Sequence, residues 1–460
     1  IPSRLDEGYG LNKEAIKQIK DEGCDLLITV DCGIVSREET RYAAEIGLKT
    51  IVTDHHNPGD TVAEGIIINP KLPGDEYPFK GLAGVGVAYK FACAVKEKRA
   101  IPKSVITEVL ELAALGTIAD LMPLVDENRT IVKYGLSIMR GARNLGVSKL
   151  IDVAGLDRSK LTSTDVSFGL APRINAAGRL GDASLGVKLL MSEDENEAES
   201  LAKKLNEINS LRRDYQQEAF EQCMEKAEEE LRYGDFILVT AEGCHEGILG
   251  IVAGRIKETL ERPTIIIQRN YQEGDDRILY KGTGRSRGRV DLYEMLRNHE
   301  DLLVQFGGHS AACGFAIEED NIEELKYALN EDLEMLLEED ERIMDEEVSV
   351  DTGIESEDVS LELVNCISCF EPCGKGNPKP VIMLKNSKIS RWRFMGGGTV
   401  HASFNVDKVR CVCFNKAEQL YKNIDINNQN VMYNITGYLE LNEWQGHANP
   451  QFRVIDITSI

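Results

Sequence analysis

The sequence has no apolar run of about 18 residues, the length that a membrane-spanning helix needs, so no membrane span is expected. Basic residues are also scarce, since 53 lysines and arginines stand against 77 aspartates and glutamates, which gives a net charge of −24. Much of the acidic excess falls in two helical stretches, residues 193–232 and 318–347. Acidic helices of this kind do not exclude a local basic groove, so the net charge alone does not exclude nucleic acid as a partner.

The sequence also lacks a disulfide framework. Its 11 cysteines are scattered singly through hydrophobic stretches, which is typical of a protein in the reducing cytoplasm. One group stands out, namely Cys366, Cys369 and Cys373, followed by Cys411 and Cys413. Its spacing is not the paired pattern of a zinc site, and buried thiols in strands are the favoured interpretation.

The chain begins at Ile1, with neither an initiator methionine nor a signal peptide, and the first residues read as ongoing structure. The simplest interpretation is a fragment that lacks its natural N-terminus. A length of 460 residues exceeds one compact core, so two to four domains are expected. Hydrophobic residues at 42% and charged residues at 28% give the balance of a globular protein.

The N-terminal part alternates helices and strands. "LNKEAIKQIKDEGCDLLITVDCGI" predicts a helix, a turn and a strand, and "SREETRYAAEIGLKTIVTDHH" repeats the order. This alternation indicates a parallel sheet covered by helices. The first strand ends at Asp31 and the second at Asp54. Ligands of open α/β sheets bind at the carboxyl ends of strands, so both carboxylates and the two histidines after Asp54 are expected at one sheet edge.

The side chains at this edge suit a hard divalent cation, because aspartate and histidine without cysteine are typical ligands of Mn²⁺, Mg²⁺ or Fe²⁺. Asp31, His55 and Asp120 are the predicted metal ligands; Asp120 follows a helix expected over residues 103–119. Asp54 and His56 are the predicted catalytic residues. Asp54 could bind the metal or orient an imidazole, and His56 could face a phosphate or transfer a proton. The alternative for a single aspartate at a strand end is a simple cap.

The rest of the chain divides into three further parts. Apolar residues at helical spacing predict one long, acidic helix from residue 195 to 232, which we interpret as a connector. A second α/β unit follows, and the tail from about residue 348 has short alternating strands typical of a small β-barrel, with the OB-fold as the leading candidate. The predicted boundaries are 1–185, 186–232, 233–347 and 348–460.

Several basic and glycine-rich segments could contact phosphates. "KGTGRSRGR" and "APRINAAGRL" carry arginines, which bind phosphate through two donors, and "FGGHSAACG" has two glycines that let backbone approach an anion. Solvated loops and a tight turn are the alternatives. The predicted substrate-binding residues are Arg173, Asn175, Arg179, His245, Lys281, Arg285, Ser286, Arg287, Gly307, Gly308 and His309.

Taken together, "VDCG", "TDHH", "GTIAD", "APRINAAGRL", "HEGILGIVAGRI", "GTGRSRG" and "FGGHSAACG" resemble the bacterial RecJ exonucleases of the DHH phosphoesterase superfamily. "EPCGKGNPKP" and the late "LELNEW" are similar to the OB domain of that family. The resemblance covers essentially the whole chain, and implies a DHH domain, a DHHA1 domain and an OB domain.

The resemblance implies a 5′-to-3′ exonuclease that hydrolyses single-stranded DNA in repair and recombination with two Mn²⁺ or Mg²⁺ ions. The implied partners are single-stranded DNA, a single-strand-binding protein and a helicase, and the expected state is a cytoplasmic monomer. In the tail, Trp392, Phe394 and Trp444 are candidates for stacking on bases, or for barrel core.

The family places a further aspartate-rich motif before the segment that "IPSRLDEGYG" resembles, so we expect only part of a two-metal site and slow cleavage in this chain. Two other functions remain open. A phosphodiesterase for short oligonucleotides or cyclic dinucleotides shares the DHH and GGH motifs but typically lacks the tail. A non-catalytic scaffold that binds single strands would have lost the metal ligands.

Overall fold

The computed structural model describes residues 10–180, 182–270, 278–422, 424–425, 431–444 and 446–460. They form two compact units. One contains residues 145–155 and 172–347, and the other contains residues 9–144, 156–171 and 348–460. Packing therefore groups the helices around residues 145–155 and 172–191 with the long helix and the second sheet, rather than with the first sheet as the predicted boundaries have it. None of the helices in the described ranges is long and apolar enough to cross a membrane.

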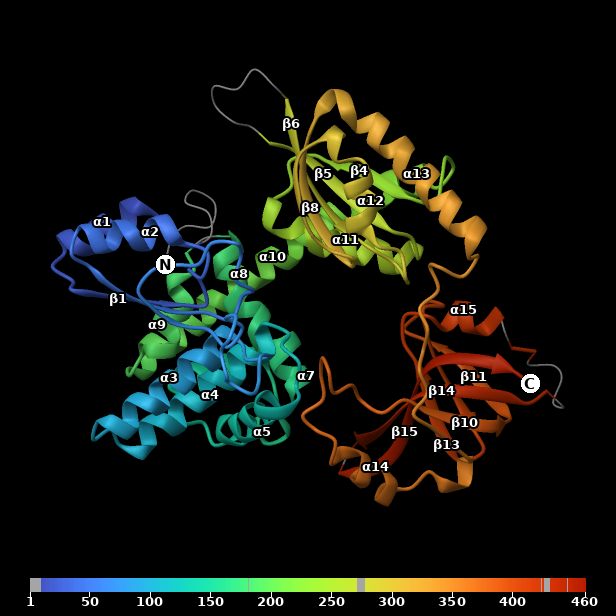
Figure 1. Ribbon diagram of the computed structural model, residues 1–460. Helices are drawn as coiled ribbons and strands as arrows, with labels where there is room; N and C mark the ends of the chain where they lie inside the picture. The colour runs from blue at the N-terminus through green and yellow to red at the C-terminus, as the bar shows by residue number, and fades with distance from the viewer. Residues whose placement is uncertain (1–9, 181, 271–277, 423, 426–430, 445) are drawn as a thin grey trace. The chain divides into compact units, whose positions relative to one another are not determined.

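The first sheet has the predicted parallel strands. Its order is β1-β2-β3, and every neighbouring pair is parallel. Ile16, Ala43 and Leu48 form a small buried core with Leu27 of β1, which places α1 and α2 on one face. The elements are α1 (Lys13–Asp21), β1 (Leu26–Val30), α2 (Arg37–Glu45), β2 (Lys49–Thr53) and β3 (Ile66–Ile68) (Figure 1).

Helices follow the first sheet. The helix predicted over residues 103–119 is confirmed as α4 (Lys103–Ala119), and α3 (Gly84–Lys98) precedes it. Helix α4 packs against α3 and against α5 (Asp126–Arg140). Short helical turns between residues 158 and 170 complete this part: η1 (Arg158–Lys160), α7 (Ser163–Asp165) and η2 (Val166–Leu170).

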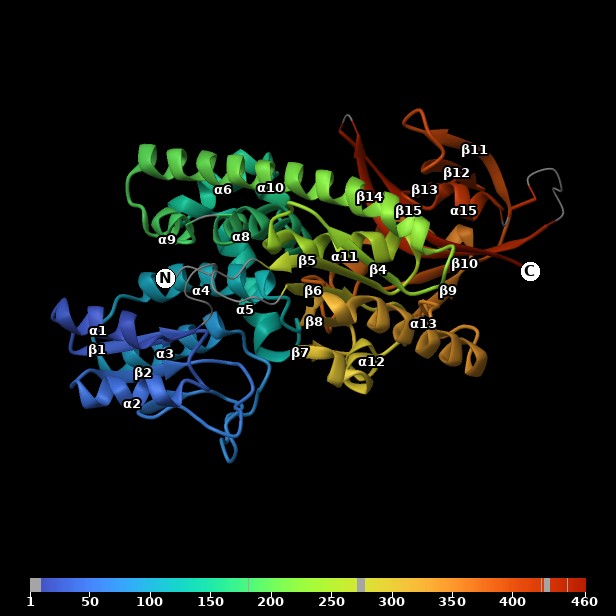
Figure 2. The ribbon, with the colours of Figure 1, turned by 90° about the horizontal axis from the view of Figure 1, so that it is seen from above.

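The long helix is α10 (Glu195–Glu230), which is 36 residues long and confirms the prediction. Its first half packs on α6 and α9, and its second half packs on α11 and β4 (Figure 2). Asp194 caps its N-terminus by accepting a hydrogen bond from the Glu197 amide. The helix is thus partly buried, not a free connector. The neighbouring helices are α6 (Leu145–Ala154), α8 (Ala171–Leu180) and α9 (Ser184–Met191).

The second sheet is mixed, with the order β4-β5-β6-β8-β7, and only β4 and β5 are parallel. Helices α10 and α11 cover one face, and α12 and α13 cover the other. Strand β7 is an edge strand. The elements are β4 (Ile237–Ala241), α11 (Glu246–Leu260), β5 (Thr264–Asn270), β6 (Leu279–Arg285), α12 (Leu292–Asn298), η3 (Glu300–Leu302), β7 (Leu303–His309), β8 (Ala312–Glu318), η4 (Glu319–Asn321) and α13 (Ile322–Glu339).

The C-terminal strands form one sheet with the order β11-β12-β13-β15-β14-β10-β9 (Figure 1). Phe404, Phe452 and Ile435 lie at its core. The short alternating strands predicted for this tail are confirmed as β11 to β15, whereas β9 and β10 were not predicted. The elements are β9 (Thr352–Ile354), η5 (Ser356–Asp358), α14 (Leu361–Ser368), β10 (Ile382–Ser387), β11 (Ile389–Met395), β12 (His401–Val406), β13 (Val409–Cys413), α15 (Ala417–Lys422), β14 (Tyr433–Trp444) and β15 (His447–Ser459).

The cysteine interpretation holds only in part. Cys411 and Cys413 are buried in β13, but Cys366 and Cys369 are exposed at the end of α14 rather than buried in strands. All 11 thiols are free. Among the described residues these cysteines form no group with metal-ligand spacing.

A buried acid on α4 makes stability depend on pH. Glu111 is fully buried, and its Oε1 has no hydrogen-bond partner, while Oε2 accepts a hydrogen bond from the Asn144 amide at 3.1 Å. Burial raises the pKa of Glu111 from 4.5 to about 7. The folded state therefore favours the neutral acid. The free energy of unfolding decreases as pH rises from about 4.5 through 7, so the protein becomes less stable.

We predict that Glu111→Gln stabilises the protein above pH 7 by about 2–3 kcal/mol, because the cost of ionising a buried acid disappears. Below pH 4.5 the two proteins should be equally stable, so the substitution flattens the pH dependence. Urea unfolding at pH 5 and pH 8 measures this. Glu97→Gln, at an exposed position of α3, is the control and should leave the pH dependence unchanged.

Candidate metal centre

The ends of β1 and β2 meet at one edge of the first sheet. Val30 pairs with Thr53, so Asp31 and Asp54 follow directly on neighbouring strands. The Asp31 amide continues the ladder by donating to the Thr53 carbonyl at 3.0 Å. Asp31 then takes a φ of 63°, in the left-handed region, which turns the chain away from the sheet. The parallel register thus brings both carboxylates to the same place, as the sequence predicts.

Asp54 is the buried member of the pair, with only 1% of the residue exposed. Its Oδ2 accepts a hydrogen bond from the Ile34 amide at 3.0 Å. Its Oδ1 accepts from the His55 amide at 2.7 Å, the His56 amide at 3.2 Å and His56 Nδ1 at 2.7 Å. Burial acts to raise the pKa of Asp54, but these hydrogen bonds together lower it, so the group stays ionised.

His55 is held in one orientation by backbone. Its Nδ1 lies 3.0 Å from the Leu82 carbonyl oxygen, and because a carbonyl only accepts, Nδ1 carries the hydrogen. Nε2 then points to the two predicted partners, 3.0 Å from Asp31 Oδ1 and 3.5 Å from Asp120 Oδ2. The hydrogen bond to Asp31 raises the pKa of His55, against the effect of burial. A proton between these groups occupies the position that a cation would take.

The Asp31 carboxylate lies at the start of α3. A Cβ atom placed on Gly84 would be 2.2 Å from Asp31 Oδ1, so only glycine leaves room for this side chain. The N-terminus of a helix also favours a negative charge. Residues 82–84 therefore position both His55 and Asp31.

Asp120 caps the C-terminus of α4 and remains 45% exposed on its side chain. Burial of the remainder raises its pKa, whereas the positive charges of His55, His56 and Lys375 lower it. Its Oδ2 faces His55 Nε2, which brings the third predicted ligand to the same point.

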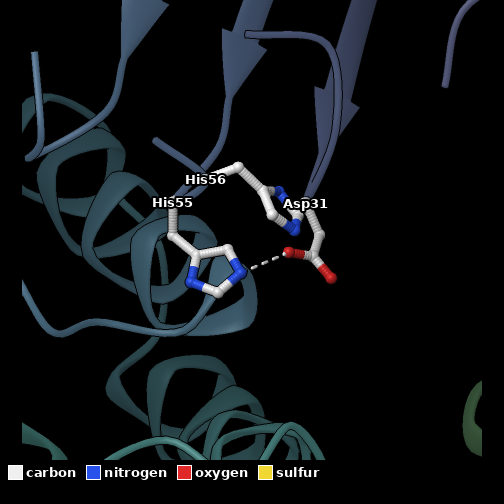
Figure 3. Close-up of side chains that lie close together, drawn as sticks. All are labelled: Asp31, His55 and His56. Carbon is white, nitrogen blue, oxygen red and sulfur yellow. Dashed lines mark ion pairs between the residues drawn. The ribbon is translucent and has the colours of Figure 1, made fainter. Parts of the chain in front are cut away.

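The donor set fits a divalent metal ion. One ligand atom from each of Asp31, His55 and His56 lies within 4.8 Å of the others (Figure 3). Asp120 Oδ2 lies 3.5 Å from the same His55 Nε2 atom that faces Asp31. The hydrogen bond from His55 Nδ1 to a carbonyl is the outer contact that typically fixes a metal-binding imidazole. His56 also lies in this group, and its ring is held by the hydrogen bond between Nδ1 and Asp54.

The predicted substrate-binding residues lie in the other compact unit. Arg173 Nε donates to Asn206 Oδ1 at 2.9 Å, and Arg179 donates to the Gly247 carbonyl at 2.7 Å. Lys281 is paired with Glu246 at 3.2 Å. These contacts tie the segment "APRINAAGRL" to α10 and to the start of α11, together with His245, which caps α11, and Asn175, which lies on α8.

Two of the predicted residues have contacts that suit a structural role instead. The Arg287 side chain is only 7% exposed and pairs with Glu346 at 2.9 Å, Glu261 at 3.2 Å and Glu258 at 3.4 Å. The Ser286 hydroxyl donates to the Val290 carbonyl. Three carboxylates already neutralise Arg287, so neither residue is kept among the proposed phosphate contacts.

The segment "FGGH" forms the end of edge strand β7, before a tight turn to β8. Gly307, Gly308 and His309 are exposed, and His309 Nδ1 accepts a hydrogen bond from the Ala311 amide at 3.2 Å. A Cβ on Gly308 would lie 2.4 Å from the Ala312 carbonyl oxygen, which explains the glycine by strand pairing. An anion could still reach this exposed edge.

Sequence reasoning missed two arginines of α10. Burial lowers the pKa of Arg212, and the charges of Arg179 and Arg213 lower it further. Burial also lowers the pKa of Arg173 and of Arg285, and the charges of Arg213 and Arg179, respectively, act in the same direction. Five guanidinium groups thus gather where α8, α10 and β6 approach, a concentration of positive charge that suits phosphate. The acidic composition of α10 concealed Arg212 and Arg213.

In the C-terminal sheet, Trp392 stacks on buried Phe404 with ring centroids 4.7 Å apart, so it belongs largely to the core. Phe394 is 40% exposed and packs edge-on against Tyr421, which is 37% exposed. Phe394 and Tyr421 therefore form the exposed aromatic pair. The side chain of Trp444 lies outside the described part of the chain.

Three ranges of the chain match known domain families. Residues 1–117 match the DHH family, N-terminal domain, residues 234–335 match the DHHA1 domain, and residues 350–456 match the RecJ OB domain. The single-stranded-DNA-specific exonuclease RecJ of Escherichia coli is 32% identical over 487 residues, which cover 100% of this chain and 82% of the relative. The chain belongs to the RecJ family.

Two further RecJ proteins support this membership. RecJ of Bacillus subtilis is 37% identical over 99% of this chain, which spans 57% of that relative. The crystal structure of RecJ from Thermus thermophilus in complex with Mn²⁺ superposes with a TM-score of 0.82 at 30% identity, covering 97% of this chain and 63% of that one. The predicted RecJ fold, with DHH, DHHA1 and OB domains, is confirmed.

Gly84 offers a test of the metal centre that does not alter any ligand. We predict that Gly84→Ala weakens Mn²⁺ binding by roughly 10–100-fold, because the new Cβ displaces the Asp31 carboxylate. Folding stability should fall little, since the nearest atoms all belong to the exposed Asp31 side chain.

Titration calorimetry with Mn²⁺ and a thermal melt measure the two effects. Gly59→Ala is the control, because a Cβ at this exposed loop position makes only ordinary contacts. Equal Mn²⁺ affinity in Gly84→Ala and the parent would mean that Asp31 does not hold the ion.

Proposed function

We propose that this chain is a metal-dependent 5′-to-3′ exonuclease that hydrolyses the phosphodiester bonds of single-stranded DNA in repair and recombination. The observation that carries the proposal is the convergence of Asp31 and Asp120 on His55 Nε2, while the Leu82 carbonyl fixes the orientation of the His55 ring. Membership of the RecJ family and the likeness to a Mn²⁺-bound RecJ support it.

Asp31, His55 and Asp120 would hold Mn²⁺ or Mg²⁺. A bound ion at such a site activates water and stabilises the charge that develops on the phosphoryl oxygens. Two ions are proposed for the complete reaction. The carboxylates of Asp31 and Asp120 supply the negative charge that such ions require, and the ionised Asp54 keeps the strand end in shape without contacting substrate.

His56 is proposed to act on the substrate itself. Its Nδ1 donates to Asp54 at 2.7 Å, which leaves Nε2 as the ring nitrogen for other contacts, and the side chain is 60% exposed. An imidazole oriented by a buried carboxylate can hold a phosphate oxygen or transfer a proton to a leaving group. Asp54 thus acts through His56, as a positioning residue.

The substrate contacts proposed outside the metal centre are cationic or aromatic. Arg179, Arg285 and the newly found Arg212 offer guanidinium donors for backbone phosphates. Phe394 and Tyr421 offer exposed rings on the C-terminal sheet, where bases of a single strand can stack. The remaining proposed contacts are Arg173, Asn175, His245, Lys281, Gly307, Gly308 and His309.

The cellular setting is also part of the proposal. Because all 11 cysteines are free, the chain suits a reducing compartment, and we propose that it acts as a monomer in the cytoplasm. An exonuclease specific for single strands needs duplexes to be opened, so a helicase and a single-strand-binding protein are proposed as partners.

We predict that Asp31→Asn lowers the cleavage rate of a 5′-phosphorylated single strand by about 10³-fold, since losing a metal ligand removes roughly 4 kcal/mol of transition-state stabilisation. Binding of the same strand should change less than threefold. Release of nucleotides in Mn²⁺ is measured beside fluorescence anisotropy, with Asp60→Asn in the exposed loop as the control. A parent protein that releases no nucleotides from single strands would refute the function.

Salt dependence tests the proposed phosphate contacts. Despite the net charge of −24, affinity for single-stranded DNA should fall with salt, with a log–log slope of roughly −0.7 for each phosphate neutralised. Arg179→Gln should reduce the slope by about 0.7, whereas Arg297→Gln, at an exposed residue paired with Glu294, should not change it. An affinity independent of salt would remove the arginines from the account.

A further inference from the structure

One loop of the C-terminal domain reaches the segment that follows Asp120. The loop comprises residues 371–377, "EPCGKGN", and is called the docking loop below. The Leu124 amide donates to the Lys375 carbonyl at 2.6 Å. Arg129 donates to the carbonyls of Glu371 and Pro372, both at 3.2 Å. Leu124 lies close to the metal-ligand candidate Asp120 along the chain, so the loop is fastened beside the metal centre.

Further contacts hold the docking loop in one conformation. The Ser163 hydroxyl donates to the Cys373 carbonyl at 2.6 Å, and the Asn377 side chain donates to the Pro372 carbonyl at 2.8 Å. Bonds from three residues of the first domain, Leu124, Arg129 and Ser163, therefore reach four carbonyls of this short loop. A solvated surface loop does not need so many partners distant in sequence, so this one has a fixed position relative to Asp120.

Two glycines let the docking loop lie close to the first domain. A Cβ on Gly374 would be 2.8 Å from Leu124 Cδ1, and a Cβ on Gly376 would be 3.0 Å from Pro123 Cβ. Gly376 also has a φ of 73°, in the left-handed region. Between them stands Lys375, whose carbonyl faces the protein while its side chain is exposed. The backbone of the docking loop thus lies close to the first domain, while the Lys375 side chain is exposed to solvent.

The positive charge of Lys375 is not neutralised by an ion pair within the described part of the chain. In the ranges that the structure describes, Lys375 forms no ion pair, whereas Lys379 in the same segment pairs with Glu440 at 3.0 Å. Its backbone carbonyl is bonded to Leu124, which follows Asp120 closely along the chain. Lys375 is thus an unpaired cation on a loop fixed near the carboxylates that would hold divalent ions.

We propose that Lys375, carried by the docking loop of the C-terminal domain, binds a backbone phosphate of the nucleic-acid strand that enters the metal centre. This inference rests on the proposed function, and it adds to it a contact that reaches the reaction site from the domain otherwise expected only to hold the distant strand. Lysine suits this role as a compact point charge that tolerates small shifts of a moving strand.

The test combines a substitution that removes the charge of Lys375 with a DNA strand in which one phosphate has lost its charge. Lys375→Gln should lower kcat/KM on a single strand roughly tenfold, mostly through KM, because one charged contact is lost. Lys375→Arg should restore most of the loss. The melting temperature and Mn²⁺ affinity should not change, since the loop is held through backbone atoms that the substitution leaves in place.

Strands with one methylphosphonate linkage then identify the phosphate. At the linkage that Lys375 contacts, the parent and Lys375→Gln should bind and cleave equally, because the partner charge is already gone. At every other linkage the tenfold difference should persist. Lys408→Gln, an exposed lysine of the same domain, is the charge-matched control and should show no such linkage.

Each outcome decides the proposal. Equal kcat/KM for Lys375→Gln and the parent, or a tenfold loss that no single linkage abolishes, would overturn it. If the parent cleaves no strand, the proposed function fails instead. Anisotropy with the same methylphosphonate strands then still shows whether Lys375 contacts one phosphate.

Discussion

The buried carboxylate of Asp54 is the interaction on which the candidate metal centre depends. It accepts hydrogen bonds from the amides of Ile34, His55 and His56 and from the His56 ring, so one ionised group fixes the end of β2, the turn after β1 and an imidazole. Hydrogen bonds to a charged acceptor contribute about 1.5–3 kcal/mol each, which offsets the cost of burying the charge. Because Asp54 is fully used in this way, the neighbouring Asp31, His55 and Asp120 remain available for a cation.

Other residues of the site also orient the candidate metal ligands without binding the ion themselves. The Leu82 carbonyl fixes the His55 tautomer and Gly84 leaves space for Asp31, although neither residue carries charge. The docking loop of the C-terminal domain adds a third fixed element next to Asp120. Carboxylates thus gather in one compact unit, and a cluster of arginines gathers in the other. The net charge of −24, which is the sum over both and over acidic helices, describes neither surface.

Local pattern was sufficient for most of the elements and for the sheet edge at which Asp31 and Asp54 meet. Asp31 and Asp54 could be assigned because strand ends are readable from short apolar runs, and parallel pairing then brings them together. The ion pairs of Arg287 could not be predicted, since its three glutamate partners come from residues 258, 261 and 346, and only folding brings them together. Arg212 and Lys375 were missed because one lies in an acidic helix and the other in a loop whose position depends on contacts with the first domain. The short strands β9 and β10 lack the alternation that revealed the others.

The central claim is that the ends of β1 and β2, with Asp120, form a metal centre. Crystals grown with Mn²⁺ and measured at the manganese absorption edge test it most directly, because anomalous difference density locates the ion independently of activity. The account predicts a peak within about 2.3 Å of oxygen atoms of Asp31 and Asp120 and of His55 Nε2. Strong manganese peaks elsewhere in the protein, with none between these side chains, would contradict it.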